Sequence, residues 1–135
     1  LKVAPDSAAV NHSYGLLLVR QQRYSEALTY LEQGARLLDS QPRYAYIYAI
    51  ALDSMGNTET SIDFLYEAIE TWPNQFDLLV TLVSYLEKMG RENEIALPLS
   101  LLHSFAANTP EVQLFTRKYP LEKYINFQLT LVVTV

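Results

Sequence analysis

The chain has 135 residues, of which 50% are hydrophobic and 19% charged, so it can bury a core and is expected to fold as a single domain. Ten basic and 15 acidic residues give a net charge of -5, and because nucleic-acid affinity depends on neutralising phosphates, we expect no nucleic-acid partner. The absence of cysteine excludes disulfides, thiolate metal sites and covalently attached haem within this chain, and it leaves the cellular compartment open.

A repeat of 34 residues runs through most of the chain, as Tyr14 and Tyr48 illustrate. Three units are expected, over about 8–41, 42–75 and 76–109. The positions that agree in phase carry either small or large apolar residues: Tyr14, Tyr48 and Leu82; Gly15, Ala49 and Val83; Leu18, Leu52 and Leu86; Ala27, Ser61 and Ile95; Leu31, Leu65 and Leu99; Gly34, Ala68 and Leu102. One such unit cannot bury its apolar face alone, so neighbouring units are expected to stack.

Each unit reads as two amphipathic helices separated by a short polar break. In the first unit the break is 20–23. In the second and third units the breaks contain Gly56 and Gly90, which can adopt the left-handed conformation that ends a helix. Pro42, Pro73 and Pro110 each follow the expected end of a second helix.

The third unit departs from the other two. It has Val83, Ile95 and Leu102 where the earlier units have smaller residues, which predicts a looser or rotated pair. Pro98 lies inside its second helix, and a proline there removes a backbone hydrogen bond. We therefore expect a kink near Ala96-Leu97 or a helix that is split at that point.

The C-terminal part contains one more helix and a tail. A helix over 110–119 is expected to cap the last unit with an apolar face of Val112, Leu114, Phe115 and Tyr119. The tail over 120–135 ends in an uncharged, β-branched run that is too short to span a membrane. It is either a disordered end or a segment that packs on this chain or on a second copy.

The pattern resembles the tetratricopeptide repeat family, with the second unit matching best through Tyr48-Ala49, Leu52, Gly56, Ser61, Leu65, Ala68 and Pro73. The resemblance implies an all-α, right-handed solenoid of three helix pairs plus a short terminal helix and an irregular tail. The repeat domain would cover 1–119 and the tail 120–135. A generic array of helical hairpins is the alternative.

The sequence contains no pattern that indicates catalysis. The two histidines, His12 and His103, have no second ligand at metal-binding spacing, and metal sites need three or four convergent ligands. The four glycines are scattered, which argues against a phosphate-binding loop. We therefore expect no enzyme, no cofactor and no metal site.

In the tetratricopeptide family the first helix of each pair lines a concave groove that holds a peptide. The resemblance implies partner-binding residues at His12, Leu16, Val19, Tyr46, Ile50, Asp53, Val80 and Ser84. The alternative is that some of these residues are simply core. Some members bind a chaperone carboxylate through cationic residues, at positions that match His12, Leu16, Ile47, Asp77 and Thr81 here, so this chain lacks that clamp.

Two classes of function fit these features. The first is a non-catalytic module that binds a peptide or helix of a protein partner in the groove. The second is a structural, self-association or accessory domain of a larger protein, in which a second copy is a possible partner. A weaker resemblance of residues 11–21 to C-terminal repeat modules of bacterial multihaem cytochrome proteins implies such an accessory role, with haem sites outside this chain.

Overall fold

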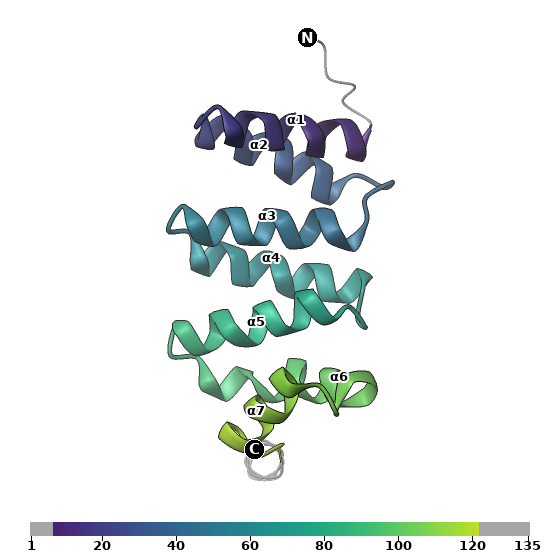
Figure 1. Cartoon of the computed structure of the whole chain (residues 1–135), viewed down its shortest axis with the longest axis vertical. Coiled ribbons are helices and arrows are strands. Elements are labelled where there is room, and N and C mark those ends of the chain that lie inside the picture. Colours follow the sequence, from purple (N-terminus) through teal and green to yellow (C-terminus); the bar gives the residue numbers. More distant parts are fainter. Residues whose placement is uncertain (1–6, 122–135) are drawn as a thin grey trace, which may run out of the picture. The chain divides into compact units, whose positions relative to one another are not determined.

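The computed structural model describes residues 7–121, and within this range every regular element is helical (Figure 1). The elements are α1 (Ala8–Arg20), α2 (Tyr24–Arg36), α3 (Pro42–Ser54), α4 (Thr58–Thr71), α5 (Phe76–Lys88), the 3-10 helix η1 (Glu92–Glu94), α6 (Ala96–Ala106) and α7 (Pro110–Lys118). The all-α class is confirmed. The expectations for the tail lie outside the described residues from 122 onward.

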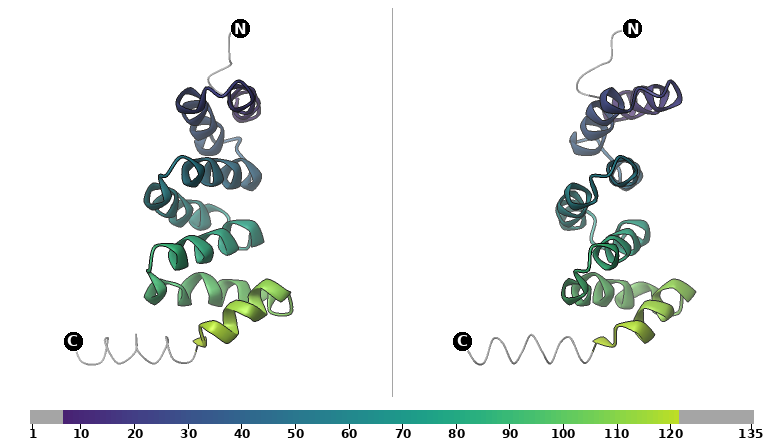
Figure 2. Two further views of the ribbon diagram at one scale, coloured as in Figure 1. Left: turned by 60° about the vertical axis from the view of Figure 1, so that its left-hand side comes forward. Right: turned by 90° about the vertical axis from the view of Figure 1, so that its left-hand side faces the viewer.

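Consecutive helices form antiparallel pairs, α1 with α2, α3 with α4 and α5 with α6, and α7 follows the last pair (Figure 2). The predicted solenoid repeat of three helix pairs plus a terminal helix is confirmed as the fold class. The chain divides into two compact units, and from here on these are called the first unit (helices α1–α4, up to Trp72) and the second unit (helices α5–α7, from Pro73). The 34-residue units of the sequence are called repeats. A single repeat domain over 1–119 stays a prediction.

The turn inside each pair has the same backbone geometry in all three repeats. Gln22, Gly56 and Gly90 have φ values of 60°, 82° and 71°, which lie in the left-handed region. The next residue in each case donates its N–H to the carbonyl five positions earlier, as from Arg23 to Leu18 at 2.9 Å. This is the hydrogen bond of a Schellman motif. Gln22 therefore occupies a position that the other two repeats give to glycine.

Two glycines bring the first pair together. A Cβ atom on Gly15 would lie 2.7 Å from Leu31 Cδ2, and one on Gly34 would lie 3.0 Å from the backbone N of His12. No larger residue fits either position without moving a neighbour, so α1 and α2 approach closely along much of their length. The N-terminus of α1 is held by Asp39, whose carboxylate oxygens accept from Ala8 N–H at 3.1 and 3.2 Å.

The second pair, α3 and α4, has alanine rather than glycine at the equivalent positions. Ala49 and Ala68 are buried, and the hydroxyl of buried Ser61 donates to the Ala49 carbonyl at 2.8 Å. Beside them the rings of Tyr48 and Phe64 meet edge to face at a centroid distance of 4.8 Å. The small residues that the repeat places at these positions therefore do allow close helix contact.

In the second unit the helical segment that contains Pro98 is split into η1 and α6, as the sequence predicts. The segment begins with η1, and α6 starts at Ala96, so Pro98 falls in the first turn of α6. Backbone N–H groups in a first turn have no partner inside the helix, so the missing N–H of proline costs little there. Val83 of α5, Ile95 between η1 and α6, and Leu102 of α6 are fully buried.

Helix α7 closes the second unit through Val112 and Tyr119, which are both buried. The Tyr119 hydroxyl donates to Glu87 Oε2 at 2.5 Å, and Lys118 Nζ lies 2.7 Å from the same oxygen. Lys118 and then Tyr119 lower the pKa of the Glu87 carboxyl. The predicted apolar face is wrong at Leu114, which is 62% exposed because α7 packs through one narrow row of residues only.

Candidate partner-binding pocket

A pocket of about 310 Å³ lies between α1, α2 and α3 in the first unit; we refer to it as the apolar pocket. Leu16 and Val19 of α1 line it. Tyr24, Ala27, Leu28 and Leu31 of α2 and Ile47, Ile50, Ala51, Ser54 and Met55 of α3, with its C-cap, complete the lining. Only the Tyr24 and Ser54 side chains carry a polar atom, and none of the eleven carries a formal charge at neutral pH.

The sequence explains why this space is apolar and why it is open. Residues 16, 19 and 47, 50, 54 fall at helical spacings of three and four, so they project from one face of each first helix. Tyr24 and Met55 are 47% and 38% exposed, so the pocket reaches the protein surface at their side. An apolar site of this kind excludes charged ligands, because burying an unpaired charge is costly.

Three of the predicted partner-binding residues, Leu16, Val19 and Ile50, meet in the apolar pocket. Tyr46 is half-buried on α3 and is not among the lining residues. Asp53 is also half-buried, and its Oδ1 accepts a hydrogen bond from Thr58 Oγ1 at 2.6 Å. This bond joins the end of α3 to the start of α4, so Asp53 has a structural contact at the position the family would use for binding.

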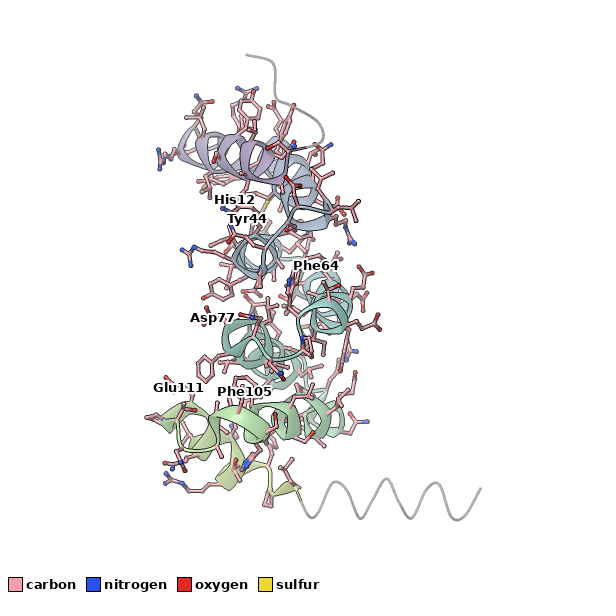
Figure 3. The ribbon with its side chains drawn as sticks, turned by 90° about the vertical axis from the view of Figure 1, so that its right-hand side faces the viewer. His12, Tyr44, Phe64, Asp77, Phe105 and Glu111 are labelled. Atoms are coloured by element: carbon pink, nitrogen blue, oxygen red, sulfur yellow. The ribbon has the colours of Figure 1, made fainter. Side chains whose placement is uncertain are left out.

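His12 packs between helices and does not line the pocket. Its ring stacks on Tyr44 of α3, with the centroids 4.2 Å apart and an interplanar angle of 21° (Figure 3). The side chain is buried, and Nδ1 has no hydrogen-bond partner. Burial, and then the positive charge of Arg43, lower the pKa of His12. The neutral ring therefore serves as a packing surface between α1 and α3.

The remaining two predicted residues belong to the second unit. Val80 and Ser84 are half-buried on α5, four positions apart on one face of the helix. Among the positions matching the carboxylate clamp, Thr81 is buried and Asp77 is exposed. A peptide carboxylate would meet a negative charge at Asp77.

Sequence reasoning missed the α2 residues of the apolar pocket, and it also missed Ala51 of α3 and the C-cap residue Met55. The family comparison directs attention to the first helix of each pair, whereas this pocket also uses the start of a second helix. One signal was available in the chain itself. Tyr24 and Leu28 are large residues one turn apart, and they come directly after the polar break that precedes the second helix.

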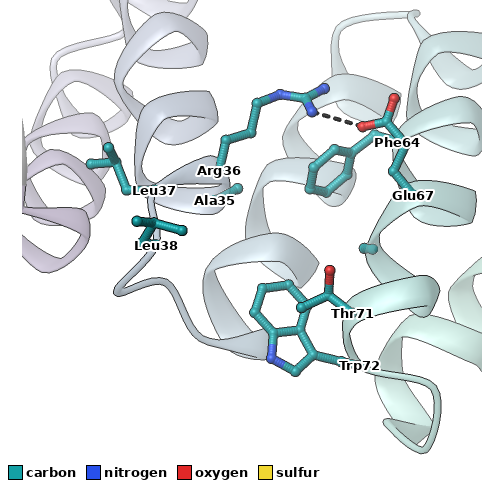
Figure 4. Close-up of a pocket in the computed structure, with 9 residues that line it drawn as sticks. Ala35, Arg36, Leu37, Leu38, Phe64, Glu67, Thr71 and Trp72 are labelled. Carbon is teal, nitrogen blue, oxygen red and sulfur yellow. Dashed lines mark hydrogen bonds and ion pairs between the residues drawn. The ribbon is translucent and has the colours of Figure 1, made fainter.

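A second pocket, of about 270 Å³, is formed by α2, α4 and the segment between α2 and α3 (Figure 4). At its edge Arg36 donates to Glu67 Oε2 at 2.7 Å and to Glu32 Oε2 at 2.9 Å, and its guanidinium lies 5.1 Å from the centre of the Phe64 ring. The hydrogen bond to Glu67 is the main cause that raises the pKa of Arg36. This cation is already paired, so it joins α2 to α4 and offers no anion site.

His103 has a structural contact in the second unit. Its Nε2 lies 2.6 Å from Thr116 Oγ1, and that hydroxyl donates its own hydrogen to the Val112 carbonyl at 2.7 Å. The hydroxyl has a single hydrogen, so His103 Nε2 is the donor to Thr116. The contact joins α6 to α7.

Neither metal-binding clusters nor membrane-spanning helices occur in the part of the chain that the structure describes. No three His, Asp or Glu side chains among residues 7–121 converge in a way that could hold a metal ion. Over the same residues, every helix is too short or too polar to cross a bilayer.

No model of a protein family and no curated protein matches this chain. Solved structures do: yeast Tom70 is 20% identical over 94% of this chain, with a TM-score of 0.67. MamA of strain AMB-1 is 25% identical over 82% with a TM-score of 0.62, and MamA of strain MSR-1 is 25% identical over 75% with a TM-score of 0.59. Both proteins contain tetratricopeptide repeats, so the resemblance seen in the sequence is confirmed at the level of the fold.

The chain covers only part of each of these structures. It spans 25% of the Tom70 chain, 61% of the MamA chain of strain AMB-1 and 58% of that of strain MSR-1. The fold is that of a protein-interaction module. The resemblance to cytochrome-associated modules stays a prediction.

Proposed function

We propose that this chain is a non-catalytic protein-binding module, and that the apolar pocket of its first unit takes large apolar side chains from a peptide or helix of a partner. The observation that carries the proposal is the lining of the pocket, which brings Leu16, Val19 and Ile50 together around about 310 Å³ of open space. An engineered cavity of roughly half that size, lined by similar side chains, stays dry and binds benzene. This pocket has room for one large side chain or two adjacent ones.

The chemistry of the lining defines the class of partner. Apart from the weakly accepting Met55 sulfur, the Tyr24 and Ser54 hydroxyls are the only side-chain groups in the lining that form hydrogen bonds, so the pocket can pair few buried polar groups of a ligand. Leucine, isoleucine, methionine and phenylalanine gain most from this environment, at about 1.5–3 kcal/mol for each side chain that is fully buried. By the repeat phase, Val80 and Ser84 of α5 correspond to Tyr46 and Ile50 of α3, and they are proposed as a separate partner contact of the second unit.

The remaining expected residues have supporting roles in this proposal. His12 holds α1 against α3 through Tyr44, and Asp53 fixes the end of α3 through Thr58. Tyr46 is half-buried on the same helix as Ile50 and is proposed to contact the partner at the margin. The partner therefore meets an apolar site whose walls are held by packed neighbours.

Selection from a random peptide library on the immobilised chain tests this function. We expect enrichment of peptides with two large apolar residues that are adjacent or one helical turn apart. An Ala51→Phe variant, which places a large side chain in the pocket, should weaken a selected peptide by at least about tenfold, equivalent to 1.4 kcal/mol.

Thr29→Phe is the matched control, because Thr29 is exposed on α2 and is not among the residues that line the pocket. It should leave the affinity unchanged. If no peptide is enriched, or if enriched peptides are charged and bind the Ala51→Phe variant equally well, the pocket is not a partner-binding site.

A further inference from the structure

Helix α6 in the second unit carries an exposed row of large apolar side chains. Leu97 and Phe105 are 55% and 43% exposed, and Leu101, midway between them at a spacing of four, is half-buried. Residues four apart lie on one face of a helix, so the three form a continuous row. We call it the α6 row.

The α6 row is uncharged as well as apolar. The whole helix, ALPLSLLHSFA, contains no Asp, Glu, Lys or Arg, and its two serines turn their hydroxyls to carbonyls of the same segment, at Leu97 and Leu101. Surface helices usually present charged side chains to water on their outer face. A helix that leaves a row of apolar residues exposed without such charges is typical of an interaction surface.

The apolar pocket and the α6 row match in chemistry and in size. Neither carries a charge, so no charged group would be buried without a partner when they meet. A pocket of about 310 Å³ can hold the Phe105 ring or the Leu97 side chain, and the spacing of four allows two residues of the row to enter together.

We propose that the partner of the apolar pocket is a second copy of this chain, and that the α6 row of one copy docks into the apolar pocket of the next. This inference rests on the proposed function and names its partner. The two surfaces are different and belong to different units, so the contact is head to tail. An open assembly of this kind keeps one free pocket at one end and one free α6 row at the other, so longer assemblies form as the concentration rises.

Two variants that each block one side test the pairing. Ile50→Asp places a charge in the pocket and leaves the α6 row intact, whereas Phe105→Asp does the reverse. Analytical ultracentrifugation of the full chain should give a mass that rises with concentration, and each variant alone should stay monomeric. An equimolar mixture of the two variants should form a discrete dimer, because one intact pocket and one intact row remain.

Controls separate docking from misfolding and from general charge effects. Leu114→Asp introduces the same charge at a side chain of α7 that is 62% exposed, and it should associate like the unaltered chain. Ala51→Phe fills the pocket without adding a charge, and it should reproduce the loss seen with Ile50→Asp. Circular dichroism must give the same helix content for all variants.

Three results would overturn the pairing. The first is a full chain that stays monomeric at every concentration. The second is association that survives both blocking variants, and the third is a mixture of the two variants that does not pair. If the chain is monomeric but still selects apolar peptides that Ala51→Phe weakens, the second-copy inference fails and the proposed function stands. If peptide selection also fails, both are wrong.

Discussion

The first helix pair, α1 and α2, meets across Gly15 and Gly34, whereas the third pair, α5 and α6, has the fully buried Val83 and Leu102 at these two repeat positions. Gly34 and Leu102 occupy the same place in the 34-residue repeat. In the first pair a Cβ atom at Gly34 would lie 3.0 Å from the backbone N of His12, whereas in the third pair the same position holds a buried leucine side chain. One repeat position therefore serves a close backbone contact in one pair and a buried side chain in the other.

The first and third helix pairs also differ in the surface that each presents to a partner. In the first pair the small residues hold α1 tightly on α2, and the apolar pocket lies where these two helices face α3. In the third pair Leu102 of α6 is buried, whereas Leu97 and Phe105 of the same helix are exposed. The first pair therefore contributes to the apolar pocket, and the third pair carries the α6 row.

The largest expected effect is the loss of a side chain from the third pair. Leu102→Ala removes a fully buried side chain from a crossing that depends on it, and the cavity should lower the free energy of unfolding by about 2–5 kcal/mol. Urea denaturation measures this change. A loss below about 1 kcal/mol would mean that α5 and α6 can collapse onto each other as closely as α1 and α2 do.

The opposite exchange should break the first pair. Gly34→Leu gives the first repeat the residue of the third, and its Cβ atom alone would lie 3.0 Å from His12 N and 3.1 Å from the Ala8 carbonyl oxygen. Backbone atoms cannot move aside easily, so we expect a loss of about 1–3 kcal/mol. The same denaturation experiment checks it, with Gln33→Leu on the exposed side of α2 as control. Equal stability of the two variants would contradict a glycine-dependent crossing.

The first unit should lose stability in mild acid through His12. The folded pKa of His12 is lowered below its ordinary value of 6.5, mainly by burial, so the unfolded chain binds the proton more readily. The neutral His12 ring therefore contributes to the free energy of unfolding. This contribution is complete above the unfolded pKa of 6.5 and is lost as the pH falls through 6.5 toward the lower folded pKa. Arg43 adds to the effect, because its charge opposes a protonated ring.

His12→Phe keeps the ring that stacks on Tyr44 and removes the titrating group. As the pH falls from neutral to mildly acidic, the melting temperature of the unaltered chain should fall relative to that of the His12→Phe variant. A difference that does not change with pH would mean that His12 titrates normally in the folded chain.

The smallest expected effect concerns the first turn. Gln22 has φ 60°, a conformation that costs a side-chain-bearing residue roughly 1–2 kcal/mol and that glycine adopts freely. Gln22→Gly gives the first repeat the residue of the other two, and it should raise the free energy of unfolding by about 0.5 kcal/mol after the greater backbone entropy of glycine is subtracted. Gly56→Ala is the matched test and should lower stability, because φ there is 82° and a residue with a Cβ atom adopts that angle at a cost. No atom lies within 4 Å of the added Cβ, so the change measures this backbone effect without a steric clash.

Much of the fold was predictable because its signals are local. The helix breaks follow from Gly56, Gly90 and the polar segment around Gln22, and the split before α6 follows from Pro98. These signals act within one or two turns of the chain, where spacing and backbone preference decide the structure. The close approach of the helices in the first two pairs was also predictable, because small residues, Gly34 and Ala68, recur at the same position of the repeat.

The site was less predictable because it depends on three helices at once. The sequence marked Leu16, Val19 and Ile50, but it could not distinguish an open wall from a buried core. It placed His12 in the groove, whereas the ring is buried against Tyr44, and it assigned Leu114 to a packed face from which α7 turns it away. Periodicity states which residues share a face, and only tertiary packing decides how much of that face a neighbour covers.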